Sequence, residues 1–373
     1  MKAKLPSSPS RGGVIISGAH GMGNIGDEAA LGRIIAELRS IDPSMPICVL
    51  SRSPAQTAKE HSVQSIHSFH LPALWGRLKN CALFISGGGT LIQDTSSTRS
   101  LLYYLLCLRL AKMRGCSVMM YGCGIGPVRR KRNRKAAAKV IERCVDAITL
   151  RDGDSLYELK AMGVCSPEIL PAIDPALFIE DMDGEALDAL LKSCGIEDRE
   201  AYICFCLRPW EGFPRAAELF AGAADYAFER HGMKSVFLSM NRGEDAALAR
   251  SAAALCRHTP IILDKSLSAA EAAGLISRMN ALVGMRLHSL VFAAKNAVPT
   301  AGISYDPKVA AFLKYIGRSN FVEAELFSAQ ALEKMIDAAA ALLPGTNETA
   351  EEMIAELKYV SRNTAEKLLA KFE

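Results

Sequence analysis

Three arginines and one histidine follow apolar runs that are typical of buried strands. Arg151, Arg208 and Arg286 each come directly after such a run, and His288 lies two residues beyond Arg286. A charged side chain costs free energy at the end of an apolar strand if it is unpaired, so a single one is usually part of a structural ion pair. Several together favour a site for a multiply charged anion, because guanidinium groups bind carboxylate and phosphate bidentately. For each arginine alone, both interpretations stay open.

Two side chains could add proton transfer and charge to such a site. His288 is the histidine in an apolar strand-to-helix context, which makes it a candidate proton donor, with a buried core histidine as the alternative. Lys308, in the segment Tyr305-Asp-Pro-Lys308, is a further candidate cation, with a solvated loop lysine as the alternative. The histidines are scattered and show no clustered ligand spacing, so no metal site is predicted.

Glycine-rich segments follow three of the expected strands. The first, Gly21-Met-Gly-Asn-Ile-Gly26, fits G-x-G-x-x-G, but the next strand ends in Leu50-Ser-Arg52 without the acidic residue of a dinucleotide site. Its backbone N–H groups and the helix that follows still favour an anion or an oxygen-rich ligand. Asp27 opens that helix either as a cap or as a ligand contact.

The other two glycine segments are Gly87-Gly-Gly89-Thr90 and Gly122–Pro127. Glycine allows a backbone to approach a ligand closely. Asp94 follows the Gly87–Thr90 segment and could accept hydrogen bonds from sugar hydroxyls, with a loop-stabilising Asx turn as the alternative.

Alternating strands and helices would position these residues. The first half predicts strands over 13–17, 46–50, 81–86, 117–121, 146–150 and 168–170, and the second over 202–207, 235–239, 260–263, 281–283 and 299–303. Helical segments separate them, so we expect the α/β class, with two doubly wound, Rossmann-like domains whose strand ends face a shared cleft. The expected domains are residues 1–178 and 179–345, followed by an exposed C-terminal helix within 346–373.

Composition excludes several classes of protein. The 373 residues suit two domains, and a hydrophobic fraction of 50% excludes a disordered chain. A net charge of +4 argues against nucleic acid as a partner. The eleven cysteines form no C-x-x-C pair and indicate reduced thiols in the cytosol. No signal peptide or membrane span is evident, so a cytoplasmic location is expected.

A basic run over Arg129–Lys135 stands out from this balanced charge. A solvated helix start is the default interpretation. The sharper one is peripheral contact with an anionic membrane surface at its cytoplasmic face, or with a pyrophosphate-linked lipid.

The motifs taken together resemble the polysaccharide pyruvyl transferase family. The matching segments, in chain order, are Gly21–Glu28, Gly87–Asp94, Gly124–Pro127, Leu150–Asp152, Asp174–Leu177, Arg208–Trp210, Met285–Ser289 and Tyr305–Lys308. The resemblance is greatest to the bacterial branch (CsaB-type) that modifies a secondary cell-wall polymer for anchoring S-layer proteins. It implies a fold similar to GT-B glycosyltransferases, with acceptor and donor sides in the N- and C-terminal domains.

The resemblance also implies the reaction and its residues. An enolpyruvyl unit would pass from phosphoenolpyruvate to a sugar, giving a pyruvate ketal. Phosphoenolpyruvate would be a substrate, and no cofactor is expected. The expected acceptor is a β-linked N-acetylmannosamine of a lipid-linked or polymeric saccharide, joined at O4 and O6. The implied residues are, for catalysis, His288, Arg151 and Lys308; for the donor, Arg286, Leu287 and Arg208; and for the acceptor, Asn24, Asp27, Gly88, Gly89 and Asp94. A nucleotide-sugar glycosyltransferase of the same fold and a non-catalytic sugar- or anion-binding module are the alternatives.

Overall fold

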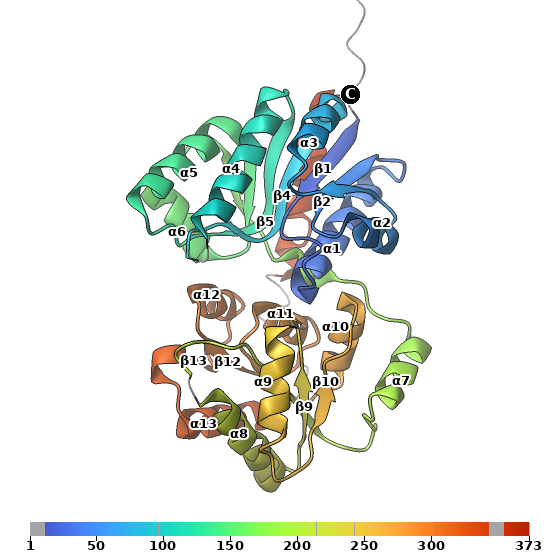
Figure 1. The fold of residues 1–373 in the computed structure, drawn as a ribbon, viewed down its shortest axis with the longest axis vertical. Helices are drawn as coiled ribbons and strands as arrows, with labels where there is room; N and C mark the ends of the chain where they lie inside the picture. Colours follow the sequence, from blue (N-terminus) through green and yellow to red (C-terminus); the bar gives the residue numbers. More distant parts are fainter. Residues whose placement is uncertain (1–11, 96, 214, 242, 343–353, 373) are drawn as a thin grey trace, which may run out of the picture. The chain divides into compact units, whose positions relative to one another are not determined.

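The computed structural model describes residues 12–342 and 354–372, apart from 96, 214 and 242. Its contacts divide the chain into two compact units (Figure 1). The first unit comprises Met1–Met22, Ala30–Pro175 and Leu357–Glu373, and the second comprises Gly23–Ala29 and Ala176–Glu356. The short segment Gly23–Ala29 thus packs with the second unit, although its neighbours in the chain pack with the first.

The first unit is built on a parallel sheet with the strand order β3-β2-β1-β4-β5-β6-β7. Its strands are β1 (Gly13–Ser17), β2 (Ile47–Ser51), β3 (Gln64–His67), β4 (Cys81–Ile92), β5 (Ser117–Ile125), β6 (Ala147–Leu150) and β7 (Glu168–Pro171). Its helices are α1 (Ile25–Ile41), which begins in the segment that packs with the second unit, α2 (Pro54–His61), α3 (Leu71–Arg77), α4 (Thr98–Met113), α5 (Lys131–Cys144), α6 (Gly153–Met162) and α15 (Val360–Leu369).

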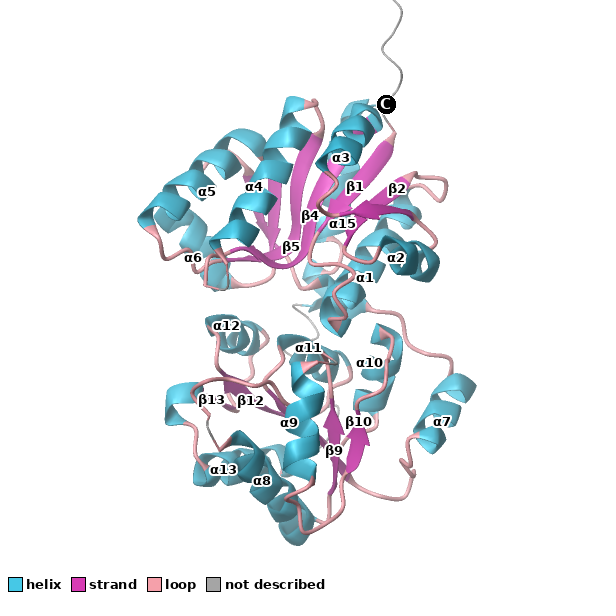
Figure 2. Ribbon diagram, viewed as in Figure 1, coloured by secondary structure: helices cyan, strands magenta, loops and turns pink. Residues whose placement is uncertain are grey.

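Helices cover both faces of this sheet because its central strands are apolar on both sides. Ile15 of β1 belongs to a core with α3, α4 and α5, whereas its neighbours Val14 and Ile16 pack with α1 and α15. Figure 2 shows α4 and α5 together on one side of the strands. The order of the strands reverses between β1 and β4, which is where ligands bind in doubly wound sheets.

The second unit has a parallel sheet of its own, ordered β10-β9-β8-β11-β12-β13. Its strands are β8 (Tyr202–Cys206), β9 (Lys234–Leu238), β10 (Ile261–Leu263), β11 (Ala281–Gly284), β12 (Thr300–Ser304) and β13 (Phe321–Glu323). Its helices are α7 (Gly184–Ser193), α8 (Ala216–His231), α9 (Glu244–Ala253), α10 (Ala269–Ser277), α11 (Leu287–Lys295), α12 (Pro307–Tyr315) and α13 (Ala329–Ala340). Here the order reverses between β8 and β11.

Two local expectations were wrong. The strands β4 and β5 do not end before their glycines but continue through them, with a register shift between Gly89 and Ile92. Gly88 (φ 71°) and Gly89 (φ 123°) adopt backbone conformations that only glycine tolerates easily, and they bend the strand without ending it.

The C-terminal helix is packed, not exposed. Ala365, Leu368 and Leu369 of α15 are buried in the core that contains Val14 and Ile16, and the Ser361 hydroxyl donates to Thr149 Oγ1 at 2.9 Å. The expected boundary between 345 and 346 lies outside the described residues, and the two units meet in the chain at Pro175 and Ala176. In the part of the chain that the structure describes, no helix combines the length and apolarity needed to cross a bilayer.

Candidate functional site

In the first unit, four of the sequence motifs converge on Arg151. Its guanidinium pairs with Asp174 and donates to Thr90 Oγ1 at 3.1 Å. Arg151 is 4% exposed and Asp174 is fully buried. A Cβ on Gly124 would lie 2.6 Å from Thr90 Oγ1 and 3.4 Å from Arg151 Nε, so glycine leaves room for this pair. Although burial opposes the charge, the Coulombic attraction of Asp174 raises the pKa of Arg151 above its usual value.

Asp94 lies in the same unit and caps α5. Its carboxylate accepts hydrogen bonds from the backbone N–H of Arg129 (2.7 Å) and Arg130 (3.0 Å) and from Asn133 Nδ2 (2.8 Å). The first turn of α5 has no acidic residue, so Asp94 supplies the negative charge that a helix N-terminus favours. Burial would raise the pKa of Asp94, but these hydrogen bonds outweigh burial and lower it. The geometry favours the structural alternative for Asp94, while its contact with an acceptor stays a prediction.

In the second unit, cationic residues follow the two strands at which the sheet order reverses. Arg208 lies two residues after β8, and Arg286 lies two residues after β11. The carboxyl ends of such strands form the usual ligand crevice of an open parallel sheet. Leu287 and His288 begin α11 directly after Arg286 and are 6% and 8% exposed.

Arg286 is oriented by a carboxylate on α9. Its Nε and Nη2 donate to the two oxygens of Asp245 at 2.9 and 2.5 Å, in the bidentate geometry that fixes a guanidinium plane. Asp245 is 1% exposed and also accepts the backbone N–H of Asn241. Burial raises the pKa of Asp245, and the hydrogen bonds and charge of Arg286 offset only part of that effect. The Nη1 of Arg286 is not used by Asp245.

Arg208 and Lys308 are also held by neighbours. Arg208 Nη1 donates to the Tyr305 hydroxyl at 2.7 Å, and its Cζ lies 4.8 Å from the centre of the same ring. Lys308, in the first turn of α12, lies with Nζ 3.2 Å from the Asp306 carboxylate and remains 28% exposed. Together with Arg286, these residues place three cations just beyond the carboxyl ends of β8, β11 and β12.

The first glycine segment lies against His288. A Cβ on Gly26 would lie 1.9 Å from His288 Nδ1 and 2.5 Å from its Cβ, so the glycine backbone packs directly on the imidazole. The segment is anchored by the hydrogen bond from Ile25 N to the Met240 carbonyl, at 3.3 Å. Asn24 Nδ2 donates to Asp27 at 2.6 Å. We expected Asn24 and Asp27 in the N-terminal domain, but both pack with the unit that contains His288.

The expected site residues therefore form two groups, one in each unit. Gly88, Gly89, Asp94 and Arg151 belong to the first unit. Asn24, Asp27, Arg208, Arg286, Leu287, His288 and Lys308 belong to the second.

Sequence reasoning missed the acidic partners of the arginines. Asp174 lies in one of the segments that carry the family resemblance, Asp174–Leu177, but its pairing with Arg151 spans 23 residues. Asp245 follows β9 on the first turn of α9, where an acidic residue also suits a helix start, so nothing in the local pattern distinguishes it.

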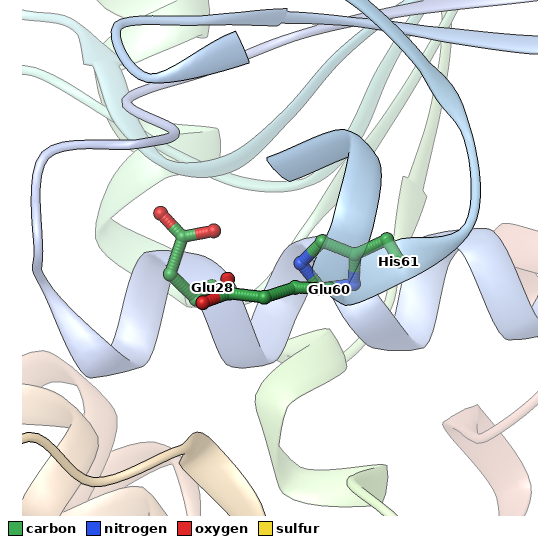
Figure 3. A group of neighbouring side chains, drawn as sticks. All are labelled: Glu28, Glu60 and His61. Atoms are coloured by element: carbon green, nitrogen blue, oxygen red, sulfur yellow. The ribbon is translucent and has the colours of Figure 1, made fainter. Parts of the chain in front are cut away.

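One group of side chains has the composition of a metal site. Glu28 on the first turn of α1 and Glu60 and His61 at the end of α2 have possible ligand atoms within 4.8 Å of one another (Figure 3). Acidic side chains often gather at a surface without an ion, and Glu28 belongs to the segment that packs with the second unit. We therefore assign no metal to this group.

Comparisons with known proteins identify the family. A family model described as polysaccharide pyruvyl transferase matches residues 24–307, which is most of the chain. The amylovoran biosynthesis protein AmsJ of Erwinia amylovora is 23% identical over 368 residues, covering 82% of this chain and 86% of that protein.

Solved structures support the fold class. HepE of Anabaena, in complex with UDP and glucose, aligns with a TM-score of 0.63 at 10% identity, over 96% of this chain and 99% of HepE. The UDP-GlcNAc 2-epimerase of Methanocaldococcus jannaschii aligns with a TM-score of 0.64 at 13% identity, over 93% and 99% of the two chains. The expected fold of two doubly wound, GT-B-like domains is confirmed. On the match over residues 24–307, the chain is a transferase that belongs to the polysaccharide pyruvyl transferase family.

Proposed function

We propose that this enzyme transfers an enolpyruvyl unit from phosphoenolpyruvate to a saccharide, forming a pyruvate ketal and releasing phosphate. The observation that carries the proposal is the family match together with the cations Arg208, Arg286 and Lys308 at the strand ends of the second unit. Phosphoenolpyruvate carries a phosphate and a carboxylate, and both anions suit guanidinium and ammonium groups.

The contacts of Arg286 suit donor binding. Asp245 occupies Nε and one N–H of Nη2, so the donors on Nη1 stay available to an oxyanion. A guanidinium that is already oriented loses little further entropy when it binds a ligand. Arg208 and Lys308 would add positive charge as phosphate departs.

His288 is the proposed proton donor. The protonated imidazole would give its proton to the methylene carbon of the enol, which leaves a cationic centre at C2. One sugar hydroxyl attacks C2, the bond from C2 to the phosphate oxygen breaks, and a second hydroxyl of the same sugar then closes the ketal ring. The two hydroxyl protons balance those taken by the methyl group and by phosphate. Gly26, packed on the ring, would keep His288 in position.

The acceptor assignment and the role of Arg151 stay proposals. We propose a β-linked N-acetylmannosamine of a lipid-linked cell-wall precursor as the acceptor, with O4 and O6 forming the ketal. The resemblance of the motifs supports this choice, and the match to an amylovoran biosynthesis protein supports a polysaccharide in general. Arg151 is proposed as an active-site cation, although Asp174 and Thr90 already use part of its guanidinium.

The direct test measures phosphate released from phosphoenolpyruvate with a panel of tagged disaccharides, followed by the mass of each product. We expect release only with a suitable acceptor, and a product heavier by one pyruvate ketal. His288→Ala should abolish turnover at saturating donor, whereas the exposed His258→Ala is the matched control and should retain it. Binding of UDP-sugars without binding of phosphoenolpyruvate would favour the nucleotide-sugar glycosyltransferase. Binding of phosphoenolpyruvate without turnover would favour a non-catalytic binding module.

A further inference from the structure

The outward side of α4 carries exposed apolar side chains that do not pack into the core. The exposed residues of this helix are Arg99, Leu102, Leu106, Arg109 and Met113, spaced by three and four residues along one face. Leu102, Leu106 and Met113 are 48%, 38% and 68% exposed. A helix at the surface of a sheet normally presents polar side chains outward. The opposite side of α4 packs into the core that contains Ile15. Leu102, Leu106 and Met113 are therefore not needed to fill that core.

The neighbouring helix α5 presents a row of cations. Arg132, Lys135, Lys139 and Arg143 are exposed and recur at helical spacing, and among the described residues no carboxylate pairs with them. The one acidic residue of α5, Glu142, instead accepts the backbone N–H groups of Cys165 and Ser166.

The same side of the sheet carries an exposed aromatic residue. Trp75 of α3 is 38% exposed, and the guanidinium of Arg114, at the end of α4, lies 4.4 Å from the centre of its ring. The helices α3, α4 and α5 share one core, and Figure 2 shows α4 and α5 side by side. We call their outward residues the α3–α5 face: Trp75, Arg99, Leu102, Leu106, Arg109, Met113, Arg132, Lys135, Lys139 and Arg143.

We propose that the α3–α5 face binds the surface of an anionic lipid bilayer. Cations next to exposed leucine, methionine and tryptophan are the combination that adsorbs to such a surface, since the cations attract lipid phosphates and the apolar side chains enter the headgroup region. A nucleic acid would leave the exposed apolar side chains of α4 in water. A second copy of the chain would bring one row of cations against another. If the acceptor is lipid-linked, docking would concentrate the enzyme at its substrate, but the inference does not depend on the reaction.

The test is cosedimentation of the full chain, without substrates, with phosphatidylcholine vesicles that either contain or lack phosphatidylglycerol. We expect binding to the anionic vesicles that weakens at high salt. Each cation near such a surface contributes about fivefold to the binding constant, so Lys135→Glu with Lys139→Glu should weaken binding by at least about 25-fold. A matched pair in the second unit, Lys192→Glu with Arg199→Glu, makes the same change in net charge and should leave binding near the wild-type value.

The apolar contribution needs its own pair of variants. Leu102→Gln with Leu106→Gln should reduce the binding that persists at high salt, whereas Leu255→Gln with Leu326→Gln, at exposed positions of the second unit, should not. Unfolding temperatures like that of the wild type show that each variant is folded. No binding to anionic vesicles, equal losses in the test and control pairs, or equally tight binding to duplex DNA would each overturn the proposal. Phosphate release with a short, untagged acceptor should survive all four double substitutions.

Discussion

Replacing Gly26 by alanine tests whether this glycine positions His288 for catalysis. The added Cβ would lie 1.9 Å from Nδ1, 2.0 Å from Cγ and 2.5 Å from Cβ of His288. Because the His288 Cβ is itself among the close atoms, rotation of the imidazole cannot relieve the contact. The backbone or the whole side chain must move.

The size of the effect follows from these distances. Ordinary van der Waals contact begins near 3.4 Å, so the ring must move by about 1.5 Å. Misplacement of a catalytic group by about 1 Å can cost about 100-fold in rate. We therefore expect turnover at saturating phosphoenolpyruvate to fall by about 100-fold or more, although alanine by itself favours a helix over glycine by about 1 kcal/mol.

The assay is steady-state phosphate release with saturating donor and acceptor. Gly222→Ala in α8 is the matched control, because nothing lies within 4 Å of the added Cβ there, and it should retain activity and gain slightly in stability. In a His288→Ala background, Gly26→Ala should cause no further loss, since the two substitutions act on the same group. Turnover of Gly26→Ala within about threefold of the wild type would refute the reasoning, and so would an additive loss in the double variant.

Three further predictions concern the carboxylates and one arginine. Asp174→Ala leaves the buried charge of Arg151 without its partner and should cost about 3–5 kcal/mol in urea unfolding; a cost below about 1 kcal/mol would contradict the buried pair. Asp94 has a lowered pKa, so its carboxylate stabilises the fold above the unfolded-state pKa of about 4 and loses that effect as pH falls through the folded-state value. The stability difference between wild type and Asp94→Asn should therefore shrink at low pH, and a difference independent of pH would count against this capping role. Arg286→Lys loses the bidentate pair with Asp245 and should raise KM for phosphoenolpyruvate about tenfold or more, with a smaller effect on kcat; an unchanged KM would exclude Arg286 from the donor site.

Most of the fold could be predicted because its signals are local. Short apolar runs such as Gly13–Ser17 and Tyr202–Cys206 are buried on both faces, which is characteristic of parallel strands. The glycines after Ser86 suggested the end of a strand, but β4 pairs with β5 on both sides of its bulge. The packing of α15 could not be predicted, because its mixed charge suits a free helix as well as one with a single buried side.

The site was predictable in its residue types but not in its pairings. Arginines at strand ends follow from the chain itself, whereas their partners come from distant segments. Arg286 meets Asp245 across 41 residues, and Asp94 caps a helix that begins 37 residues later. Such pairs depend on the strand order and on how neighbouring helices pack.

The sequence alone determined the alternation of strands and helices and the cationic residues at strand ends, because hydrophobic periodicity and glycine act over a few residues. Only the tertiary structure decided which charges are paired. It set Asp174 against Arg151 and Asp245 against Arg286, and it placed Gly26 on the ring of His288. It also brought the exposed apolar side chains of α4 next to the cations of α5. The physical reason is that an ion pair or a close contact requires two chain segments to meet, and their meeting depends on the packing of the whole unit.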